Sequence, residues 1–155
     1  MGTLQEELRQ RRPFHSAAHE AVVGLMRTAD LVRRQMTALV EPHGITHQQF
    51  NVLRILRSGG DEGVPTLEVA DRMVEQTPGV TRLLDRLEAK ELVRRQRCPK
   101  DRRQHLCWIA PKGLSVLQKL DASTLRAHEE ALKGLAAKDR AHFIKLLDAI
   151  RAPHR

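Results

Sequence analysis

The fold of this chain is predicted by one stretch, Thr77-Pro78-Gly79-Val80-Thr81-Arg82-Leu83-Leu84-Asp85-Arg86-Leu87-Glu88-Ala89-Lys90. Its apolar residues recur at spacings i, i+3, i+4 and i+7, which at about 100° per residue places them in one stripe along a short helix. Such a stripe has to be buried against the rest of the protein. Its members are Val80, Leu83, Leu84 and Leu87.

The opposite face of this predicted helix is small at its start and cationic along its length. Thr77 is predicted to cap the first turn, and Pro78 suits the first helical position, where its missing N–H leaves no bond unmade. Gly79 permits close approach to another molecule, and Arg82 and Arg86 follow it. A helix that enters the major groove of DNA needs this arrangement, although an ordinary surface helix with solvated arginines has the same pattern.

The composition of the chain favours a polyanionic partner. The 155 residues carry a formal net charge of +8 with a sequence pI near 10.3, and 41% hydrophobic content supports a core. Nucleic acid and an anionic membrane surface both fit this charge. Aromatic residues make up only 3%, too few to stack single strands well, so duplex DNA is favoured. We find no apolar run of about 18 residues and no signal-peptide pattern, and we expect a cytoplasmic protein without membrane contact.

The first part of the chain is predicted to be helical. Leu4 and Leu8 indicate a short helix or arm that ends at Pro13, and a helical pattern then runs from Phe14 to Val40. Because so long a helix extends beyond the core of one small domain, its apolar surface indicates a dimer. The segment Thr46-His47-Gln48-Gln49 has the form of a capping box and opens a further helix.

A helix-turn-helix is predicted where the quoted stretch begins. Val64-Pro65 reads as a brief extended piece, and Thr66 is predicted to cap a short helix that carries Leu67, Ala70 and Met73. Gln76 then leads into the helix of residues 77–90 through a tight connection. Two short helices joined in this way form a helix-turn-helix.

A basic hairpin is predicted after this helix. Residues 92–97 and 104–109 mix β-forming and polar residues, and they flank the polar tip 98–103. Between residues 94 and 103, six cations face one acid, and such crowding of like charges is relieved when phosphates neutralise it. An arginine at such a tip suits the narrow minor groove of DNA. The six cations are Arg94, Arg95, Arg97, Lys100, Arg102 and Arg103.

The C-terminal part is predicted to contain two further helices. Pro111 can start the first, whose leucines continue toward Gly134, and the second runs from Ala141 to Ile150. With the long first helix they can build a helical dimerisation layer, although a monomer could also bury these apolar residues by itself. In a dimer, the two recognition helices should lie about 34–36 Å apart, and we therefore predict an inverted-repeat DNA site.

Residues 45–120 resemble the winged helix-turn-helix core of the MarR family, the multiple antibiotic resistance regulators. The resemblance rests on Thr81-Arg82-Leu83-Leu84-Asp85-Arg86-Leu87-Glu88-Ala89-Lys90 and on Leu92-Val93-Arg94-Arg95. It also rests on the wing motif Asp101-Arg102-Arg103 followed by Pro111-Lys112-Gly113. Two positions depart from the family pattern: relatives usually carry a larger polar residue at Gly79 and a glycine at Glu91.

The resemblance implies a homodimer that binds a palindromic operator in double-stranded DNA. The helix from Thr77 would read the major groove, and Arg103 would enter the minor groove. Many members release DNA when they bind small aromatic or phenolic ligands, and the resemblance places that pocket near Met36, Val40 and Phe50. From the sequence alone, packing in the core is the favoured role of these three apolar residues. The expected DNA-binding residues are Thr77, Pro78, Gly79, Thr81, Arg82 and Arg86 in the recognition helix and Arg97, Lys100, Asp101, Arg102 and Arg103 in the wing.

We therefore expect a mainly α fold with a small β-hairpin wing, a winged helix-turn-helix with an N- and C-terminal helical dimerisation layer. Residues 1–44 would form an arm and the long dimerisation helix, residues 45–110 the DNA-binding lobe, and residues 111–155 the C-terminal dimerisation helices of a single intertwined domain.

Histidines and cysteines offer other chemistry. His15 and His19 stand at i, i+4 beside Glu20, a spacing that can bind a metal, but no third ligand is identifiable and an ordinary polar face is favoured. His43 and His47 flank a helix start, which favours a cap neighbourhood over sensing. We predict no metal site and no cofactor.

The two cysteines suggest different roles. Cys98 lies beside Arg97 and Lys100, which can lower a thiol pKa, so a redox-responsive regulator is an alternative. Cys107 is predicted to pack as a small hydrophobe, and Trp108 to pack at the base of the wing.

Three function classes remain open. The favoured class is a dimeric sequence-specific transcriptional regulator, a repressor by our reading, that is not an enzyme. A small metal- or thiol-dependent enzyme would need a nucleophile with its base, paired carboxylates or a complete ligand set, which the sequence does not supply. A DNA-coating protein without sequence preference shares the charge but does not need one shaped helix plus a wing.

Overall fold

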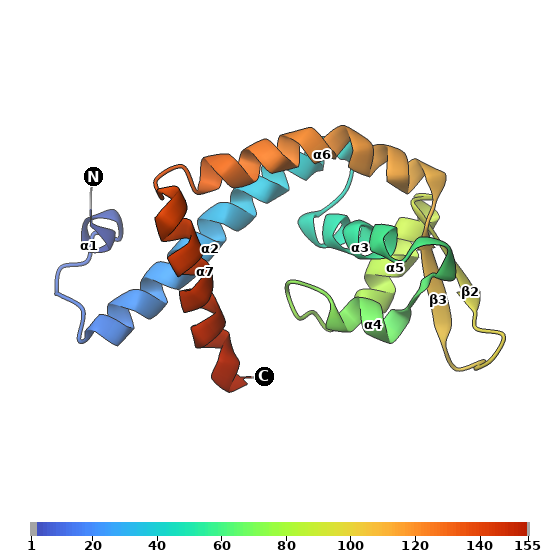
Figure 1. Cartoon of the computed structure of the whole chain (residues 1–155), viewed down its shortest axis with the longest axis horizontal. Helices are drawn as coiled ribbons and strands as arrows, with labels where there is room; N and C mark the ends of the chain where they lie inside the picture. The colour runs from blue at the N-terminus through green and yellow to red at the C-terminus, as the bar shows by residue number, and fades with distance from the viewer. Residues whose placement is uncertain (1–2, 155) are drawn as a thin grey trace. The chain divides into compact units, whose positions relative to one another are not determined.

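The computed structural model describes residues 3–154 (Figure 1). The chain divides into two compact units, residues 1–47 and residues 48–155. Each unit is described by itself. Among residues 3–154, no helix combines the length and the apolar character that crossing a membrane requires.

The first unit is built on one long helix. The short helix α1 (Leu4–Glu7) begins with a capping box, because Thr3 Oγ1 accepts the Glu6 N–H and the Glu6 carboxylate accepts the Thr3 N–H. Helix α2 (Ala17–Val40) starts later than the predicted Phe14, since the Ser16 hydroxyl caps its first turn by accepting the His19 N–H at 3.1 Å. The 3₁₀ turn η1 (Glu41–His43) and the left-handed Gly44 end it. Its exposed apolar side chains are Val22, Leu25, Met26 and Leu31.

The core helix α3 (His47–Ser58) starts directly after Thr46 as predicted, and all of it but His47 belongs to the second unit. It buries Phe50, Val52, Leu53, Ile55 and Leu56. The 3₁₀ turn η2 (Gly60–Glu62) follows, and helices α4 (Thr66–Asp71) and α5 (Val80–Ala89) complete the helix-turn-helix. The predicted stripe of α5 is confirmed: Val80, Leu83, Leu84 and Leu87 are all buried.

Two details of the predicted helix-turn-helix are wrong. Thr66 is the first residue of α4 rather than its cap, and its hydroxyl donates instead to the carbonyl of His105 at 3.2 Å. The connection is not tight, because residues 72–79 separate the two helices. The amide side chain of Asn51 in α3 supports this connection by accepting the Val74 N–H at 2.8 Å.

Helix α5 begins at Val80, so Thr77 and Pro78 precede it and neither occupies the predicted capping or first helical position. The reason is the backbone of Gly79, whose φ of 144° and ψ of 23° lie far from helical values. A side chain-bearing residue rarely adopts this conformation, so the glycine decides where the helix starts.

Helix α5 ends in a Schellman motif. The Leu92 N–H donates to the Leu87 carbonyl at 2.9 Å, and the Glu91 N–H donates to the Glu88 carbonyl at 2.8 Å. Glu91 takes the left-handed conformation, φ 60°, that glycine adopts without strain. The departure from the family pattern at this position therefore keeps the turn and adds strain to it.

The predicted hairpin, β2 and β3 in Figure 1, is confirmed. It belongs to a three-stranded antiparallel sheet in the order β1-β3-β2. Strand β2 (Val93–Arg97) pairs with β3 (His105–Ile109), with Arg95 opposite Cys107. The extended piece Val64–Pro65 is the edge strand β1, in which Val64 pairs with Cys107.

Two helices follow the sheet. Helix α6 (Pro111–Ala131) starts at Pro111 as predicted but ends before Gly134, and α7 (Ala137–Arg151) begins four residues before the predicted Ala141. Arg140 accounts for this tight corner, because it donates to the carbonyls of Leu132 and Leu135 and pairs with Glu129 at 2.6 Å. The 3₁₀ turn η3 (Ala152–His154) closes the described chain.

Candidate nucleic-acid interface

The outer face of α5 carries two arginines with no charged partner. Arg82 and Arg86 are exposed, as is Thr81 between them and Gly79. Within residues 3–154, neither arginine lies within 4.0 Å of a carboxylate oxygen. Because helix α5 buries its apolar stripe, these side chains are held on the opposite face and are free to contact phosphates or base edges.

The tip of the wing is a second source of unpaired positive charge. Four cations lie on or next to the turn between β2 and β3, and all are exposed: Arg97, Lys100, Arg102 and Arg103. None of these four forms an ion pair with any residue of the described range. Asp101 is turned back into the tip, where its side chain accepts the Arg103 N–H at 3.0 Å and its carbonyl accepts the Gln104 N–H.

The two remaining cations of the hairpin, Arg94 and Arg95, are engaged within the protein, and neither belongs to the predicted DNA-binding set. Arg94 stacks on Trp108, with its guanidinium carbon 4.4 Å from the ring centroid. Arg95 reaches from β2 to α5, where Nη2 donates to Asp85 at 2.5 Å and to Glu88 at 2.7 Å. Partial burial alone would lower the pKa of Arg95, but the hydrogen bonds and charges of Glu88 and Asp85 raise it overall.

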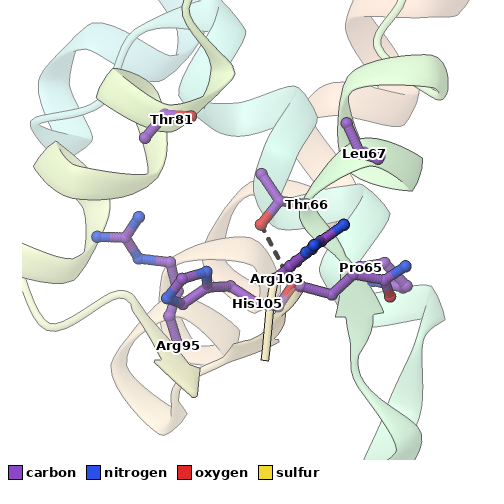
Figure 2. Close-up of a pocket in the computed structure, with 8 residues that line it drawn as sticks. Pro65, Thr66, Leu67, Thr81, Arg95, Arg103 and His105 are labelled. Carbon is purple, nitrogen blue, oxygen red and sulfur yellow. Dashed lines mark hydrogen bonds between the residues drawn. The ribbon is translucent and has the colours of Figure 1, made fainter. Parts of the chain in front are cut away.

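A hollow of about 330 Å³ lies between α5, the start of α4 and the wing (Figure 2). It brings together two predicted contact residues from distant parts of the chain, Thr81 of α5 and Arg103 of the wing tip. Arg95 and His105 line its wing side in Figure 2. Polar and charged side chains from α5 and from the wing line the hollow. The sequence predicts that these two elements contact different grooves of DNA. Its other lining residues are Pro65, Thr66, Leu67 and Gln104.

Trp108 and Cys107 pack at the wing as predicted. Trp108 donates its Nε1–H to the Asp61 carbonyl at 2.9 Å and leaves no room for a side chain at Gly63. Cys107 is fully buried, which raises the pKa of its thiol, while the Thr66 hydroxyl 3.6 Å from Sγ and the charge of Arg95 offset part of that rise. Cys98 is a half-buried free thiol at the end of β2.

Two histidines of the first unit, His15 and His19, contact each other. The rings of His15 and His19 stack with centroids 5.6 Å apart, and His19 Nδ1 accepts the His15 N–H at 3.4 Å. Within residues 3–154, no three metal-ligating side chains of the His, Cys, Asp and Glu types gather. The candidate ligand-pocket residues Met36, Val40 and Phe50 are all buried.

Comparison with known proteins identifies relatives of this chain. The MarR family pattern matches residues 45–105. A MarR transcription factor from Planctomyces limnophilus is 36% identical, and its crystal structure covers 88% of this chain and 99% of its own with a TM-score of 0.68. The chain belongs to the MarR family.

Two further transcriptional regulators are similar to this chain. The HTH-type transcriptional regulator MhqR of Bacillus subtilis is 30% identical over 96 residues, which span 62% of this chain and 65%, just under two thirds, of that relative. Sco3205, a MarR family transcriptional regulator from Streptomyces coelicolor, was crystallised in complex with DNA. It shares the fold with a TM-score of 0.77 at 19% identity, over 91% of each chain.

For this MarR-family member, sequence reasoning missed Arg95 as a bridge between wing and recognition helix, and it missed Leu67, Gln104 and His105 beside the hollow. The signal for Arg95 was present, because Asp85 and Glu88 stand at i, i+3 on the same helix. The turn from Leu87 to Leu92 folds β2 back toward α5, and Arg95 then reaches both carboxylates.

Proposed function

We propose that this MarR-family protein is a sequence-specific double-stranded-DNA-binding transcriptional regulator. The observation that carries the proposal is the set of unpaired cations on two adjacent elements. Arg82 and Arg86 project from α5 and Arg103 from the wing tip, and the hollow between these elements brings Thr81 and Arg103 together. A helix with its neighbouring wing can contact the major groove and the adjacent minor groove at once.

In this proposal the start of α5 approaches the bases. Gly79 presents no side chain, and a Cβ at its position would meet nothing within 4 Å, so the surface there is open. Thr77, Pro78 and Thr81 surround this opening, and Arg82 and Arg86 extend beyond it toward base edges or phosphates. Arg103, with Arg97, Lys100 and Arg102, would hold the minor groove or its phosphates. Asp101 serves the same end by shaping the tip.

We propose a homodimer and an inverted-repeat operator as well. Helix α7 buries no residue, although it carries Ile144, Leu146 and Ile150 on its surface. Helix α2 likewise exposes Met26 and Leu31. Apolar surface of this extent on two helices favours a second copy of the chain, and a two-fold axis would repeat the DNA-binding elements on both half-sites.

The experiment that tests the proposal is selection of bound duplexes from a random pool, followed by salt titration on the recovered site. A sequence-specific regulator keeps an affinity gap of about 10³-fold or more between its site and random DNA of equal length. A DNA-coating protein binds both nearly equally, and that outcome would refute the proposal. An inverted repeat in the selected sequences would support the dimer.

We propose further that the protein acts as a cytoplasmic repressor and that a small aromatic or phenolic ligand releases it from DNA. Ligand control requires different affinities for the DNA-competent and DNA-incompetent arrangements of the dimer. Met36, Val40 and Phe50 are the candidate contacts. Release of the selected duplex by a panel of phenolic compounds, lost in Phe50→Ala, would support this assignment.

A further inference from the structure

We propose that Arg95 is the residue that couples the wing to the recognition helix and so determines operator selectivity, without contacting DNA itself. This inference rests on the proposed function and adds a positioning residue to it.

The first support is the geometry of its hydrogen bonds. Arg95 Nη2 donates to Asp85 at 2.5 Å and to Glu88 at 2.7 Å, and Nε donates to Glu88 at 3.0 Å. The contact with Glu88 is therefore two-pronged on the side of the arginine: Nε and Nη2 both donate to one carboxylate oxygen, Oε2, which restrains the guanidinium. Asp85 and Glu88 both lie on α5, and Arg95 lies on β2, so one side chain spans the two elements that would enter adjacent grooves.

The second support is the setting of the Arg95 side chain. Only 18% of it is exposed, whereas the cations at the wing tip are open to solvent. Across the sheet Arg95 pairs with Cys107, which is fully buried, and the preceding residue on the same face of β2, Val93, is buried as well. The base of the side chain is thus anchored in the core, and its head is held on α5.

The third support is the charge balance. Asp85 and Glu88 place two carboxylates on the recognition helix, where they would repel DNA phosphates. Arg95 neutralises much of this charge from within the protein. Since two of its nitrogens already donate to carboxylates, Arg95 is poorly placed to add a phosphate contact, in contrast to Arg103, which has no charged partner within the described chain.

The consequence is a coupling between the two sites of contact. We call the contacts of Arg95 with Asp85 and Glu88 the bridge. With the bridge intact, binding of the wing to DNA also fixes the position of α5. A base mismatch beneath α5 then cannot be relieved by a shift of the helix relative to the wing. Without the bridge, each element can adjust alone, and mismatched DNA is tolerated. Loss of Arg95 should therefore reduce selectivity and leave the number of phosphate contacts unchanged.

The test compares Arg95→Met with Arg103→Met on the selected operator and on random DNA of equal length, across about 50 to 200 mM salt. Arg95→Met should lower the ratio of operator to random affinity about tenfold, with an unchanged salt slope. Arg103→Met, the control, should lower the salt slope by about 0.9 and weaken both duplexes. A slope that falls by about 0.9 in Arg95→Met would make Arg95 a phosphate contact and overturn the proposal.

A second variant tests the bridge from the other side. The double substitution Asp85→Asn with Glu88→Gln keeps Arg95 and removes both carboxylate charges. It should raise affinity for random DNA and still lower selectivity, and the fluorescence anisotropy of Trp108, on the neighbouring strand, should fall as the wing gains mobility. Unchanged selectivity here, in a variant with an unchanged circular dichroism spectrum, would also overturn the proposal.

The outcomes separate this inference from the proposed function. If the unmodified protein shows no selectivity, the proposed function fails. If the unmodified protein is selective and both bridge variants remain equally selective, only the role of Arg95 fails. Arg95→Lys supplies the rescue: it restores a cation that can neutralise α5 but not the two-pronged contact, so its selectivity should lie between those of Arg95→Met and the unmodified protein.

Discussion

The carboxylate of Asp101 accepts a hydrogen bond from the backbone N–H of Arg103 at 3.0 Å, so the acid of the wing motif shapes the turn that presents its arginine. This local contact is an Asx-type turn. We expect Asp101→Ala to weaken operator binding about fivefold, although it removes a negative charge, because the net value of such a hydrogen bond is about 1 kcal/mol. Asp101→Asn keeps the acceptor oxygen and removes the charge. Titration by fluorescence anisotropy should show that this control binds at least as well as the unmodified protein; equal losses in both variants would contradict the shaping role.

Any side chain at position 79 should destabilise the protein, even though open space surrounds Gly79. Its φ of 144° is strained for an alanine, so Gly79→Ala should lower the free energy of unfolding by about 1–2 kcal/mol and displace the start of α5. Gly134 serves as the matched control, since it is likewise uncrowded but has no positive φ. Chemical denaturation at fixed protein concentration measures both. A neutral Gly79→Ala would show that α5 can start elsewhere without cost.

At Glu91 we expect a substitution to glycine to stabilise the protein. Its left-handed φ of 60° costs about 1 kcal/mol for a residue with a Cβ, and its ion pair with Lys112 at 3.5 Å is exposed and weak. Glu91→Gly should therefore raise the free energy of unfolding by about 1 kcal/mol. The neighbouring Lys90 has φ −87°, so Lys90→Gly should destabilise instead. We expect the thermal midpoint of unfolding to rise in Glu91→Gly and to fall in Lys90→Gly, relative to the unmodified protein. Changes of the same sign in both variants would argue against strain at Glu91.

Helix α7 should be required for dimerisation. Ile144→Glu places a charge on its exposed apolar side, where Ile144 is 59% accessible in the single chain. If this side meets a second copy, the variant should sediment as one chain at micromolar concentration and lose operator affinity. Lys145→Glu introduces the same charge on the next residue and should remain a dimer. Identical sedimentation of both variants would remove α7 from the proposed interface.

The two thiols should differ in reactivity. Burial of Cys107 raises the pKa of its thiol, so the reactive thiolate is scarce at neutral and mildly alkaline pH, whereas Cys98 is half-buried at the wing. A thiol reagent should label Cys98 in the native protein and Cys107 only on unfolding, as mass spectrometry of peptides would show.

Redox control through Cys98 predicts loss of operator affinity in peroxide. If Cys98→Ser loses operator affinity in peroxide to the same extent, redox control through Cys98 is contradicted.

Much of the fold could be predicted because its signals are local. The stripe of α5 follows from the spacing of Val80, Leu83, Leu84 and Leu87, and each is buried as this spacing requires. The hairpin follows from two β-forming runs around a polar tip, and Pro111 starts α6 where its ring is tolerated. The helix boundaries were less accurate. The start of α2 depends on the cap by Ser16, and the start of α7 depends on the contacts of Arg140. Neighbouring residues are equally plausible start positions when the sequence alone is considered.

The stretch from Thr77 to Lys90 illustrates the division between sequence and structure. Its amphipathic spacing, its two outward arginines and its position before a basic hairpin are present in the order of residues alone. Whether a cation of that hairpin stays open to solvent or pairs within the protein depends on which carboxylates lie within a few ångströms of it. Arg95 and Arg103 are chemically the same residue eight positions apart, yet one bridges to Asp85 and Glu88 and the other has no charged partner within the described chain. Electrostatic interactions depend on distance in space, and only the folded chain sets that distance.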